Sequence, residues 1–327
     1  METTLNAQAQ TWPIRGTFRI ARGARTEITV VVATIKHEQY TGRGECVPYP
    51  RYGETVDGVI KDIMSMEKLI SNGLTRDELQ TAMPAGAARN ALDCALWDLQ
   101  AKMSGKSVFE LAGIKSPHPL TTAYTLSLDT PEAMASAARE ATDKPLLKLK
   151  LGGDGDFERL EAIRAAVPEK RLIVDANEGW SGDQLKPYID ACIKADIELI
   201  EQPLPANQDE DLANISSATT ICADESAHGL DTIDQLVGKY QAINIKLDKT
   251  GGLTEALKVA EKADQLGLEI MVGCMLATSL GMAPAMVVAQ RAQVVDLDGP
   301  LLLDKDRDNA IQYDGSLMHL PSPALWG

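Results

Sequence analysis

The sequence predicts an α/β protein, a (β/α)8-type TIM barrel that carries an additional α+β domain. Three observations support this prediction. From about residue 121 onward, short apolar runs alternate with helical patterns, whereas the first 118 residues lack that alternation. The apolar runs also end on charged residues at regular intervals, as expected where parallel strands deliver side chains to one end of a barrel.

The N-terminal segment, residues 1–118, has the pattern of an α+β domain. Residues 18–49 combine β-branched runs with polar turns, which predicts antiparallel strands. Apolar residues recur at helical spacing in 56–71 and again in 87–103. We therefore expect strands first and helices second in this part of the chain.

Residues 119–301 are expected to form the barrel. Apolar runs of strand length are separated by helical patterns at 131–141, 183–195 and 253–266. A doubly wound open sheet would show the same alternation, but no GxGxxG motif follows the first run, so the closed barrel is favoured. The eight runs are TTAYTLS, PLLKLK, RLIVD, IELIE, TTICAD, AINIK, EIMVG and AQVVD.

The composition argues against several classes of partner. The formal charge is -15 and Lys and Arg do not cluster, so nucleic acid and anionic membrane surfaces are not expected partners. No apolar run is long enough for a signal peptide or a membrane span, which predicts a cytoplasmic protein. The five cysteines have no CxxC spacing and are expected to be buried, reduced thiols.

The last residues of the predicted strands point to chemistry. In such barrels the active site lies at the C-terminal ends of the strands, so side chains there are expected to face one cavity. The first five charged ends lie 22 to 26 residues apart, which is the length of one strand plus one helix and its loops. These ends, followed by that of the last strand, are Lys150, Asp175, Glu201, Asp224, Lys246 and Asp296.

Asp175, Glu201 and Asp224 are candidate metal ligands. Three carboxylates from consecutive strands would repel one another without a cation among them. Hard oxygen ligands without His or Cys favour Mg²⁺ over Zn²⁺. Any one of these acids could instead cap a helix or simply end a strand, and this alternative stays open for a single position.

Lys148, Lys150 and Lys246 are candidate catalytic groups. In the stretch PLLKLKLGG, Lys148 and Lys150 share one face of a strand. Lysines crowded by other cations are expected to have a lowered pKa and can act as general bases. Lys150 and Lys246 flank the carboxylates in chain order, so one could remove a proton beside a substrate carboxylate and the other return it with inversion. A salt bridge is the alternative for either lysine alone.

The motifs around these residues resemble the muconate-lactonizing subgroup of the enolase superfamily. They are KLK, IVDANEGW, IEQPL, ADES and INIKLDKTGGL, which are specific as a set. The resemblance covers essentially the whole chain and implies an enolase-like fold, with a capping domain of residues 1–118 completed by the tail 302–327 and a barrel of residues 119–301. It also implies one Mg²⁺ per subunit, and because related barrels associate, a homo-oligomer is expected.

The last predicted strand carries the first indication of the substrate. VVDLDGP places Asp296 and Asp298 on one face and resembles the Asp-x-Asp that holds the α-ammonium group of a dipeptide in epimerases of this subgroup. Muconate and acylated amino acids have no such group. A strand end followed by an Asp-Gly turn is the alternative explanation.

Two N-terminal segments, IARGARTE and GECVPYPRYGE, resemble the mobile cap loops of dipeptide epimerases in this subgroup. The resemblance implies that Arg25, or less favourably Arg22, binds the side-chain carboxylate of glutamate, and that Tyr49 and Tyr52 close the pocket. A guanidinium suits a carboxylate because it can bind both oxygens, although solvated surface arginines are the alternative. Thr125 matches a pocket-lining position of the family, with strand packing as the alternative.

Asn177 and Glu225 lie next to proposed ligands and are candidates to support them by hydrogen bonding. The tract GCMLATS contains no His, which disfavours the His-bearing branch of the superfamily. The resemblance as a whole implies Mg²⁺-dependent epimerisation of a small dipeptide, L-Ala-D/L-Glu, in murein peptide recycling. An N-acylamino acid racemase, an o-succinylbenzoate synthase and a non-catalytic peptide-binding protein remain alternatives.

Overall fold

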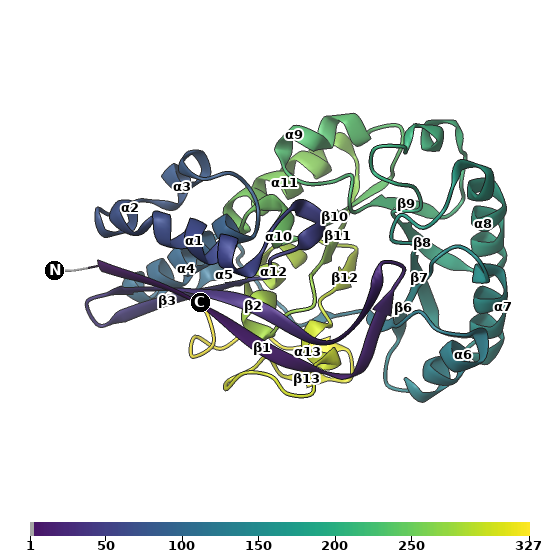
Figure 1. Ribbon diagram of the computed structural model, residues 1–327, viewed down its shortest axis with the longest axis horizontal. Coiled ribbons are helices and arrows are strands. Elements are labelled where there is room, and N and C mark those ends of the chain that lie inside the picture. The colour runs from purple at the N-terminus through teal and green to yellow at the C-terminus, as the bar shows by residue number, and fades with distance from the viewer. Residues whose placement is uncertain (1–2) are drawn as a thin grey trace.

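An antiparallel sheet packed against helices forms the N-terminal part of the chain (Figure 1). The computed structural model describes residues 3–327. Strands β1 (Thr3–Ile20) and β2 (Gly23–His37) form a long hairpin that reaches from the cap toward the barrel, and β3 (Tyr40–Cys46) pairs with β2. The helices are α1 (Val56–Ser65), α2 (Glu67–Ser71), α3 (Arg76–Ala82), α4 (Ala87–Ser104) and α5 (Val108–Leu111).

Helix α4 packs directly on β3 because two glycines leave room for its backbone. A Cβ atom on Gly44 would lie 2.1 Å from the carbonyl oxygen of Ala91, and one on Gly42 would lie 2.2 Å from that of Ala95. Both distances are far below van der Waals contact, so neither position admits a side chain without a shift of the helix. The GRG sequence of β3 therefore fixes how the helix sits on the sheet.

The helices predicted at 56–71 and 87–103 are confirmed, although the first is divided at Met66 into α1 and α2. Helix α3 is absent from the sequence prediction. Its start carries a signal that could have revealed it, because Thr75 and Glu78 form a capping box. Thr75 N donates to Glu78 Oε2 at 2.8 Å, and Glu78 N donates to Thr75 Oγ1 at 3.3 Å.

Among the described residues, eight parallel strands form the second sheet, in the order of the chain from one edge to the other. All eight predicted strands are confirmed. The sheet curls round so that Ala123 N donates to Val295 O at 2.8 Å, which joins the segment before the first strand to the last strand. The strands are β5 (Tyr124–Leu126), β6 (Leu146–Lys150), β7 (Arg171–Asp175), β8 (Ile197–Glu201), β9 (Thr220–Ala223), β10 (Ala242–Ile245), β11 (Glu269–Gly273) and β12 (Val294–Asp296).

The alternation of side chains along β6 is confirmed. Leu147 and Leu149 belong to the large core between the strands and the surrounding helices. Leu146 belongs to a separate cluster that fills the barrel interior together with residues such as Ile173 and Leu199. Because Leu146, Lys148 and Lys150 share one face of the strand, both lysines lie on the inner side of the barrel.

Helices cover the outside of the barrel, as Figure 1 shows for α6, α7 and α8. The regular alternation weakens after β8, where a short 3-10 turn, Glu210–Asn214, takes the place of a helix. No helix in residues 3–327 combines the length and the apolar character needed to cross a bilayer. The helices are α6 (Pro131–Glu140), α7 (Asp156–Ala166), α8 (Gly182–Lys194), α9 (Leu230–Ile233), α10 (Leu247–Thr250), α11 (Leu253–Leu266), α12 (Ser279–Ala289) and α13 (Gly299–Leu302).

The C-terminal tail returns to the N-terminal part of the chain. The indole N–H of Trp326 donates to the carbonyl of Cys94 at 3.1 Å, and Gly327 N donates to Asp98 Oδ1 at 2.7 Å, both on α4. Within the tail, β13 (Tyr313–Asp314) and β14 (Leu317–Met318) form a small sheet with β4 (Leu120–Thr121), which directly precedes the barrel. These contacts agree with a cap completed by residues 302–327, a division that stays a prediction.

The expectation of free, buried cysteines is largely confirmed. All five are free; Cys46, Cys94, Cys192 and Cys222 are buried, and Cys274 is partly buried. Burial raises the pKa of these thiols, which keeps them protonated and unreactive.

Candidate active site

The predicted strand ends come together at one end of the barrel. In the pairing of neighbouring strands, Lys150 lies opposite Asp175, and Asp175 lies opposite Glu201. Lys246 directly follows β10, which is four strands from β6 in the eight-strand order of the described residues. Since four strands are half the circumference, Lys150 and Lys246 approach the site from opposite sides.

Each outer lysine is paired with a carboxylate. Lys150 Nζ lies 2.6 Å from Asp175 Oδ2, and Lys246 Nζ lies 2.6 Å from Asp224 Oδ2 and 3.7 Å from Glu201 Oε1. All five side chains are buried. The salt bridges that we considered as an alternative are therefore present, but they belong to one connected cluster instead of isolated pairs.

Lys148 lies in the middle of this cluster. Its ammonium group is 2.5 Å from Glu201 Oε2, 2.7 Å from Asp296 Oδ2 and 3.3 Å from Asp175 Oδ2. Lys148 is only 1% exposed, so almost no water screens these charges. It thus connects the carboxylates of β7 and β8 with the acid that ends β12.

The expected lowering of the lysine pKa values is wrong for Lys148 and Lys246. Burial disfavours their charge, but the surrounding carboxylates outweigh burial and hold the pKa of both lysines well above the ordinary value. Burial also raises the pKa of Glu201 to about 7. A divalent cation on the same carboxylates would act in the opposite direction on the lysines, because it cancels the negative field that stabilises their charge.

The three acids fit a hard divalent cation by their chemistry and burial. Adjacent pairs already share a cationic partner: Asp175 and Glu201 share Lys148, while Glu201 and Asp224 share Lys246. Within residues 3–327 no three His, Cys, Asp or Glu side chains form a ready-made metal site, and ammonium groups contact all three of these carboxylates. The carboxylate oxygens of the three acids nevertheless point toward shared positive charges, and such a grouping of oxygens is what a Mg²⁺ site requires.

Lys249 is a buried member of the cluster that the sequence reasoning missed. Its ammonium group lies 2.6 Å from Asp224 Oδ1 and donates to the carbonyl of Asn244 at 3.0 Å. The Asn244 side chain in turn donates to Glu201 Oε1 at 2.7 Å. A signal for Lys249 exists in the sequence, because it follows Lys246 by three residues and so lies one helical turn further along.

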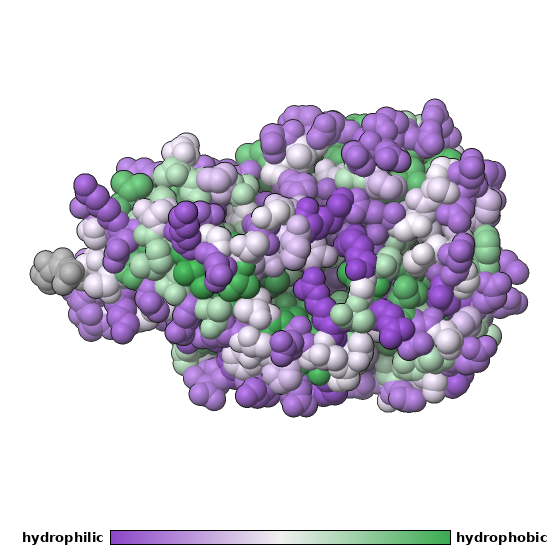
Figure 2. Space-filling view, in the orientation of Figure 1, coloured by the Kyte–Doolittle hydropathy of each residue, from purple (hydrophilic) through white to green (hydrophobic). Residues whose placement is uncertain are grey.

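A cavity of about 540 Å³ separates the strand ends from the cap. On the barrel side it is lined by Lys150, Asp224 and Lys246, and on the cap side by residues that include Arg25 and Tyr49. Figure 2 shows hydrophilic and hydrophobic side chains intermingled on the face that includes the junction of cap and barrel. The cavity has the volume of a small-molecule site, and both outer lysines line it.

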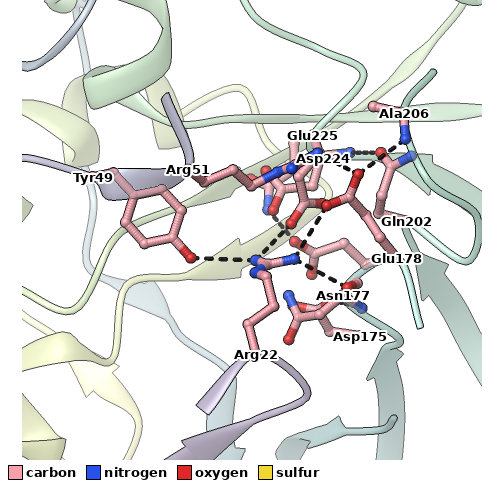
Figure 3. A network of polar contacts seen from close by, with 12 residues as sticks. Arg22, Tyr49, Arg51, Asp175, Asn177, Glu178, Gln202, Ala206, Asp224 and Glu225 are labelled. Carbon is pink, nitrogen blue, oxygen red and sulfur yellow. Dashed lines mark hydrogen bonds and ion pairs between the residues drawn. The ribbon is translucent and has the colours of Figure 1, made fainter. Parts of the chain in front are cut away.

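Arg22, at the tip of the β1–β2 hairpin, connects the cap to the barrel (Figure 3). Its guanidinium lies 2.8 Å from Glu225 Oε1 and 3.3 Å from Glu178 Oε2, and it donates to the Tyr49 hydroxyl at 3.2 Å. Arg25 also lines the cavity, but within the described residues it has no carboxylate partner and lies only near the ring of Tyr49, at 5.9 Å. Arg22 is thus already paired, whereas Arg25 has a free charge.

The two acids of the last strand are buried beside β5. Thr125 N donates to Asp298 Oδ2 at 2.6 Å. Asp296 Oδ1 is buried and finds no hydrogen-bond partner in residues 3–327. Burial, together with the charge of Asp296, raises the pKa of Asp298 to about 7. Neither acid lines the cavity between cap and barrel, and neither does Thr125, which was expected to line the pocket and instead holds Asp298 through its backbone N–H.

Asn177 and Glu225, the two candidates to support the proposed ligands, both lie at the cavity but make different contacts. Asn177 N donates to Asp175 Oδ1 at 2.8 Å, so its backbone supports that carboxylate. Glu225 contacts Arg22 of the cap and has a second oxygen, Oε2, without a partner in the described part of the chain. Glu225 therefore faces the cap and does not contact the carboxylate of Asp224.

Comparison with known proteins identifies relatives along the whole chain. The family model described as "Mandelate racemase / muconate lactonizing enzyme, N-terminal domain" matches residues 2–113, and that described as "Enolase C-terminal domain-like" matches residues 133–323. The chain is 45% identical to the L-Ala-D/L-Glu epimerase of Escherichia coli, over 97% of this chain and 99% of that protein. It is also 45% identical to an N-acetyl-D-glutamate racemase of Pseudoalteromonas, over 91% and 95%.

Solved structures give the same relationship. A crystal structure of an enolase family member from Agrobacterium tumefaciens, with homology to dipeptide epimerases, was determined with bound sodium, L-Ala-L-Glu and an ordered loop. It matches 99% of this chain and all of its own, with 54% identity and a TM-score of 0.98. The dipeptide epimerase from Enterococcus faecalis, complexed with Mg and L-Leu-L-Tyr, matches 100% and 99% of the two chains with 30% identity and a TM-score of 0.92.

Proposed function

Because the chain belongs to the mandelate racemase/muconate lactonizing enzyme family of the enolase superfamily, we propose that it is a Mg²⁺-dependent epimerase of the dipeptide L-Ala-D/L-Glu. Its relatives identify it as an isomerase that acts on amino acid derivatives. The observation that carries the proposal is the opposed placement of Lys150 and Lys246 on either side of the buried carboxylates. Two bases on opposite faces of one carbon are what inversion at that carbon requires.

In this mechanism Asp175, Glu201 and Asp224 would hold Mg²⁺, which supplies Lewis-acid stabilisation of the negative charge that develops on the substrate carboxylate. One of the lysines, Lys150 or Lys246, removes the α-proton of the C-terminal residue. The other delivers a proton to the opposite face, so the configuration inverts. The buried ammonium of Lys148 stays charged and adds positive potential beside the developing enolate.

The substrate's two ends suit charges on opposite sides of the site. Asp296 and Asp298 do not line the cavity, but Asp296 Oδ1 is buried without a partner in residues 3–327, and we assign it as the acceptor for the free α-ammonium group of a dipeptide. Arg25 carries the free guanidinium at the cavity and is assigned the side-chain carboxylate of glutamate, while Tyr49 lies between the two arginines. Arg22 is already engaged with Glu178 and Glu225, which disfavours it for that task.

The relationship to an N-acetyl-D-glutamate racemase supports a second candidate, racemisation of an N-acylated amino acid. An acylated substrate keeps the carboxylate for Mg²⁺ but has no ammonium group for Asp296 and Asp298. The buried acids favour the dipeptide, because an unpaired carboxylate oxygen beside a neutral acyl group would remain unsatisfied. An o-succinylbenzoate synthase lacks any such supporting observation.

The test is proton NMR of L-Ala-D-Glu in D₂O with the enzyme and Mg²⁺, compared with N-acetyl-D-glutamate under the same conditions. The proposal expects loss of the glutamate α-proton signal and the appearance of L-Ala-L-Glu. If only N-acetyl-D-glutamate is turned over, the function is the second candidate, racemisation of an N-acylated amino acid, and not dipeptide epimerisation. A cytoplasmic location, a role in murein peptide recycling and assembly into a homo-oligomer are further parts of the proposal that this experiment leaves aside.

A further inference from the structure

Gln202 occupies a strained position between two of the proposed metal ligands. It follows Glu201 directly in the sequence, it is fully buried, and its backbone φ is 34°, in the left-handed region that residues other than glycine rarely adopt. Such strain persists only where the surroundings hold the residue in place. The contacts of the side chain provide that hold.

The side-chain amide of Gln202 joins the ends of β8 and β9. Its Oε1 accepts from the backbone N–H of Asp224 at 2.8 Å and of Ser226 at 3.1 Å. Its Nε2 donates to the carbonyl of Leu204 at 2.9 Å. Two N–H donors on one side and a carbonyl on the other fix the orientation of the amide, because a reversed amide would place donor against donor.

A polar network outside the site holds this amide in turn. Gln202 Nε2 donates to the Tyr240 hydroxyl at 2.9 Å and to Ser226 Oγ at 3.0 Å. Both hydroxyls donate to Asp209 Oδ2, at 2.8 Å and 2.7 Å. The charge of Asp209 is balanced by Lys239, 2.5 Å away. Every polar atom of the Gln202 side chain is therefore satisfied, and it links the strand ends to a rigid support.

We propose that Gln202 is a positioning residue that sets the separation of Glu201 and Asp224 for Mg²⁺. The inference rests on the proposed metal site and deepens it. Gln202 acts on Glu201 through the shared backbone and on Asp224 through its N–H, so one side chain controls two ligands on neighbouring strands. Groups that orient ligands in this way typically affect metal affinity 10- to 100-fold.

The chain offers a matched control. Gln241, an exposed residue, accepts through Oε1 from the backbone N–H of Ile221 in β9 at 3.0 Å, the same kind of bond that Gln202 makes just beyond the other end of that strand. The variants to compare are Gln202→Met and Gln241→Met. Each removes one amide, but only the first lies beside the carboxylates. Tyr240→Phe, which removes the support of Gln202, is a milder third variant.

The experiment is titration calorimetry of each purified variant with Mg²⁺ alone, together with thermal unfolding. We expect the Mg²⁺ dissociation constant to rise about 10- to 100-fold in Gln202→Met, to rise about 2- to 10-fold in Tyr240→Phe, and to stay within twofold of the wild type in Gln241→Met. If Gln202→Met does not fold, the contrast between Tyr240→Phe and Gln241→Met decides.

Two results would overturn the inference. If Gln202→Met folds and binds Mg²⁺ with wild-type affinity, Gln202 has only a structural role. The same conclusion follows if Gln202→Met and Gln241→Met lose equal Mg²⁺ affinity. Absence of Mg²⁺ binding by the wild type would instead overturn the metal site and the proposed function along with it, so the two failures are distinguishable.

Discussion

The ammonium group of Lys148 lies 2.7 Å from the carboxylate of Asp296, and this contact joins the proposed proton-transfer site to the proposed binding site for the substrate's ammonium group. Lys148 also pairs with Glu201 and Asp175. One buried cation thus contacts three acids of different strands, two assigned to the metal and one to the substrate. Its removal should expose the repulsion between them.

Lys148→Met is expected to lower the free energy of unfolding by about 3–5 kcal/mol without Mg²⁺, because buried Asp296 loses its cationic partner and Asp175 and Glu201 each lose one of theirs. Added Mg²⁺ should restore more stability to the variant than to the wild type, since the ion replaces the missing positive charge. Urea unfolding with and without Mg²⁺ measures both effects. Lys186→Met, at a well-exposed ion pair, is the control and should change stability by less than about 1 kcal/mol. Equal responses of the two variants would contradict this account.

Substitution of either outer lysine is expected to abolish epimerisation. Lys150→Ala and Lys246→Ala should each lower the rate of inversion by at least about 10²- to 10⁴-fold, because one face of the α-carbon loses its acid or base. Solvent deuterium exchange, followed separately from L-Ala-D-Glu and L-Ala-L-Glu, shows which lysine serves which epimer. Substantial epimerisation by either variant would exclude the two-base mechanism.

The two arginines at the cavity should differ in their effects. Arg25→Ala is expected to raise KM for L-Ala-D-Glu about 10- to 100-fold and to leave a dipeptide without a side-chain carboxylate nearly unaffected, because Arg25 has the unpaired charge. Arg22→Ala should affect both substrates alike, since Arg22 joins the cap to Glu178 and Glu225. Steady-state kinetics with L-Ala-D-Glu and L-Ala-D-Ala tests this, and the reverse pattern would assign the glutamate side chain to Arg22.

Asp296→Asn should separate the dipeptide from the acylated substrate. Loss of the buried charge is expected to lower kcat/KM for L-Ala-D-Glu about 10²-fold, because the α-ammonium loses its anionic partner. If kcat/KM for N-acetyl-D-glutamate falls by the same factor, Asp296 acts only through its contact with Lys148. The comparison requires kcat/KM for both substrates with the wild type and the variant.

Asp93 is expected to make stability depend on pH below neutrality. Burial between α4 and α11 raises its pKa to about 6, although Thr254 donates to it from backbone and side chain. The folded pKa lies above the unfolded value of about 3.9, so the folded state binds more protons and stability falls as pH rises from about 4 to 6.

The loss amounts to at most about 3 kcal/mol for a shift of roughly two pH units. Asp93→Asn should reduce the slope of the stability profile between pH 4 and 6, measured by urea unfolding at several pH values, and leave the part due to other buried acids such as Glu201 and Asp298. Asp77→Asn, at an exposed position on α3, should leave the profile unchanged. An unchanged slope in Asp93→Asn would show that Asp93 is not the titrating group.

The sequence was sufficient to locate the strands and their charged ends, because the period of two and the regular spacing of the barrel follow from local geometry. It could not give the state of the lysines. The pKa of Lys246 depends on the short distance to Asp224, a residue 22 positions earlier, and no local pattern encodes that distance. The pairing of Arg22, not Arg25, with barrel acids likewise depends on where the hairpin tip lies in space.

The closure of the barrel has a consequence for how substrate and scaffold influence each other. Among the described residues, one backbone hydrogen bond, from Ala123 to Val295, spans the junction of β5 and β12, and the bond from Thr125 to Asp298 reinforces it. Leu297 N also donates to Thr122 Oγ1 across it at 2.8 Å, so the proposed ammonium site lies at the junction where the barrel closes. A dipeptide bound there would stabilise the junction of β5 and β12 against local opening. Backbone amide hydrogens at this junction should therefore exchange with solvent more slowly in the complex than in the free enzyme.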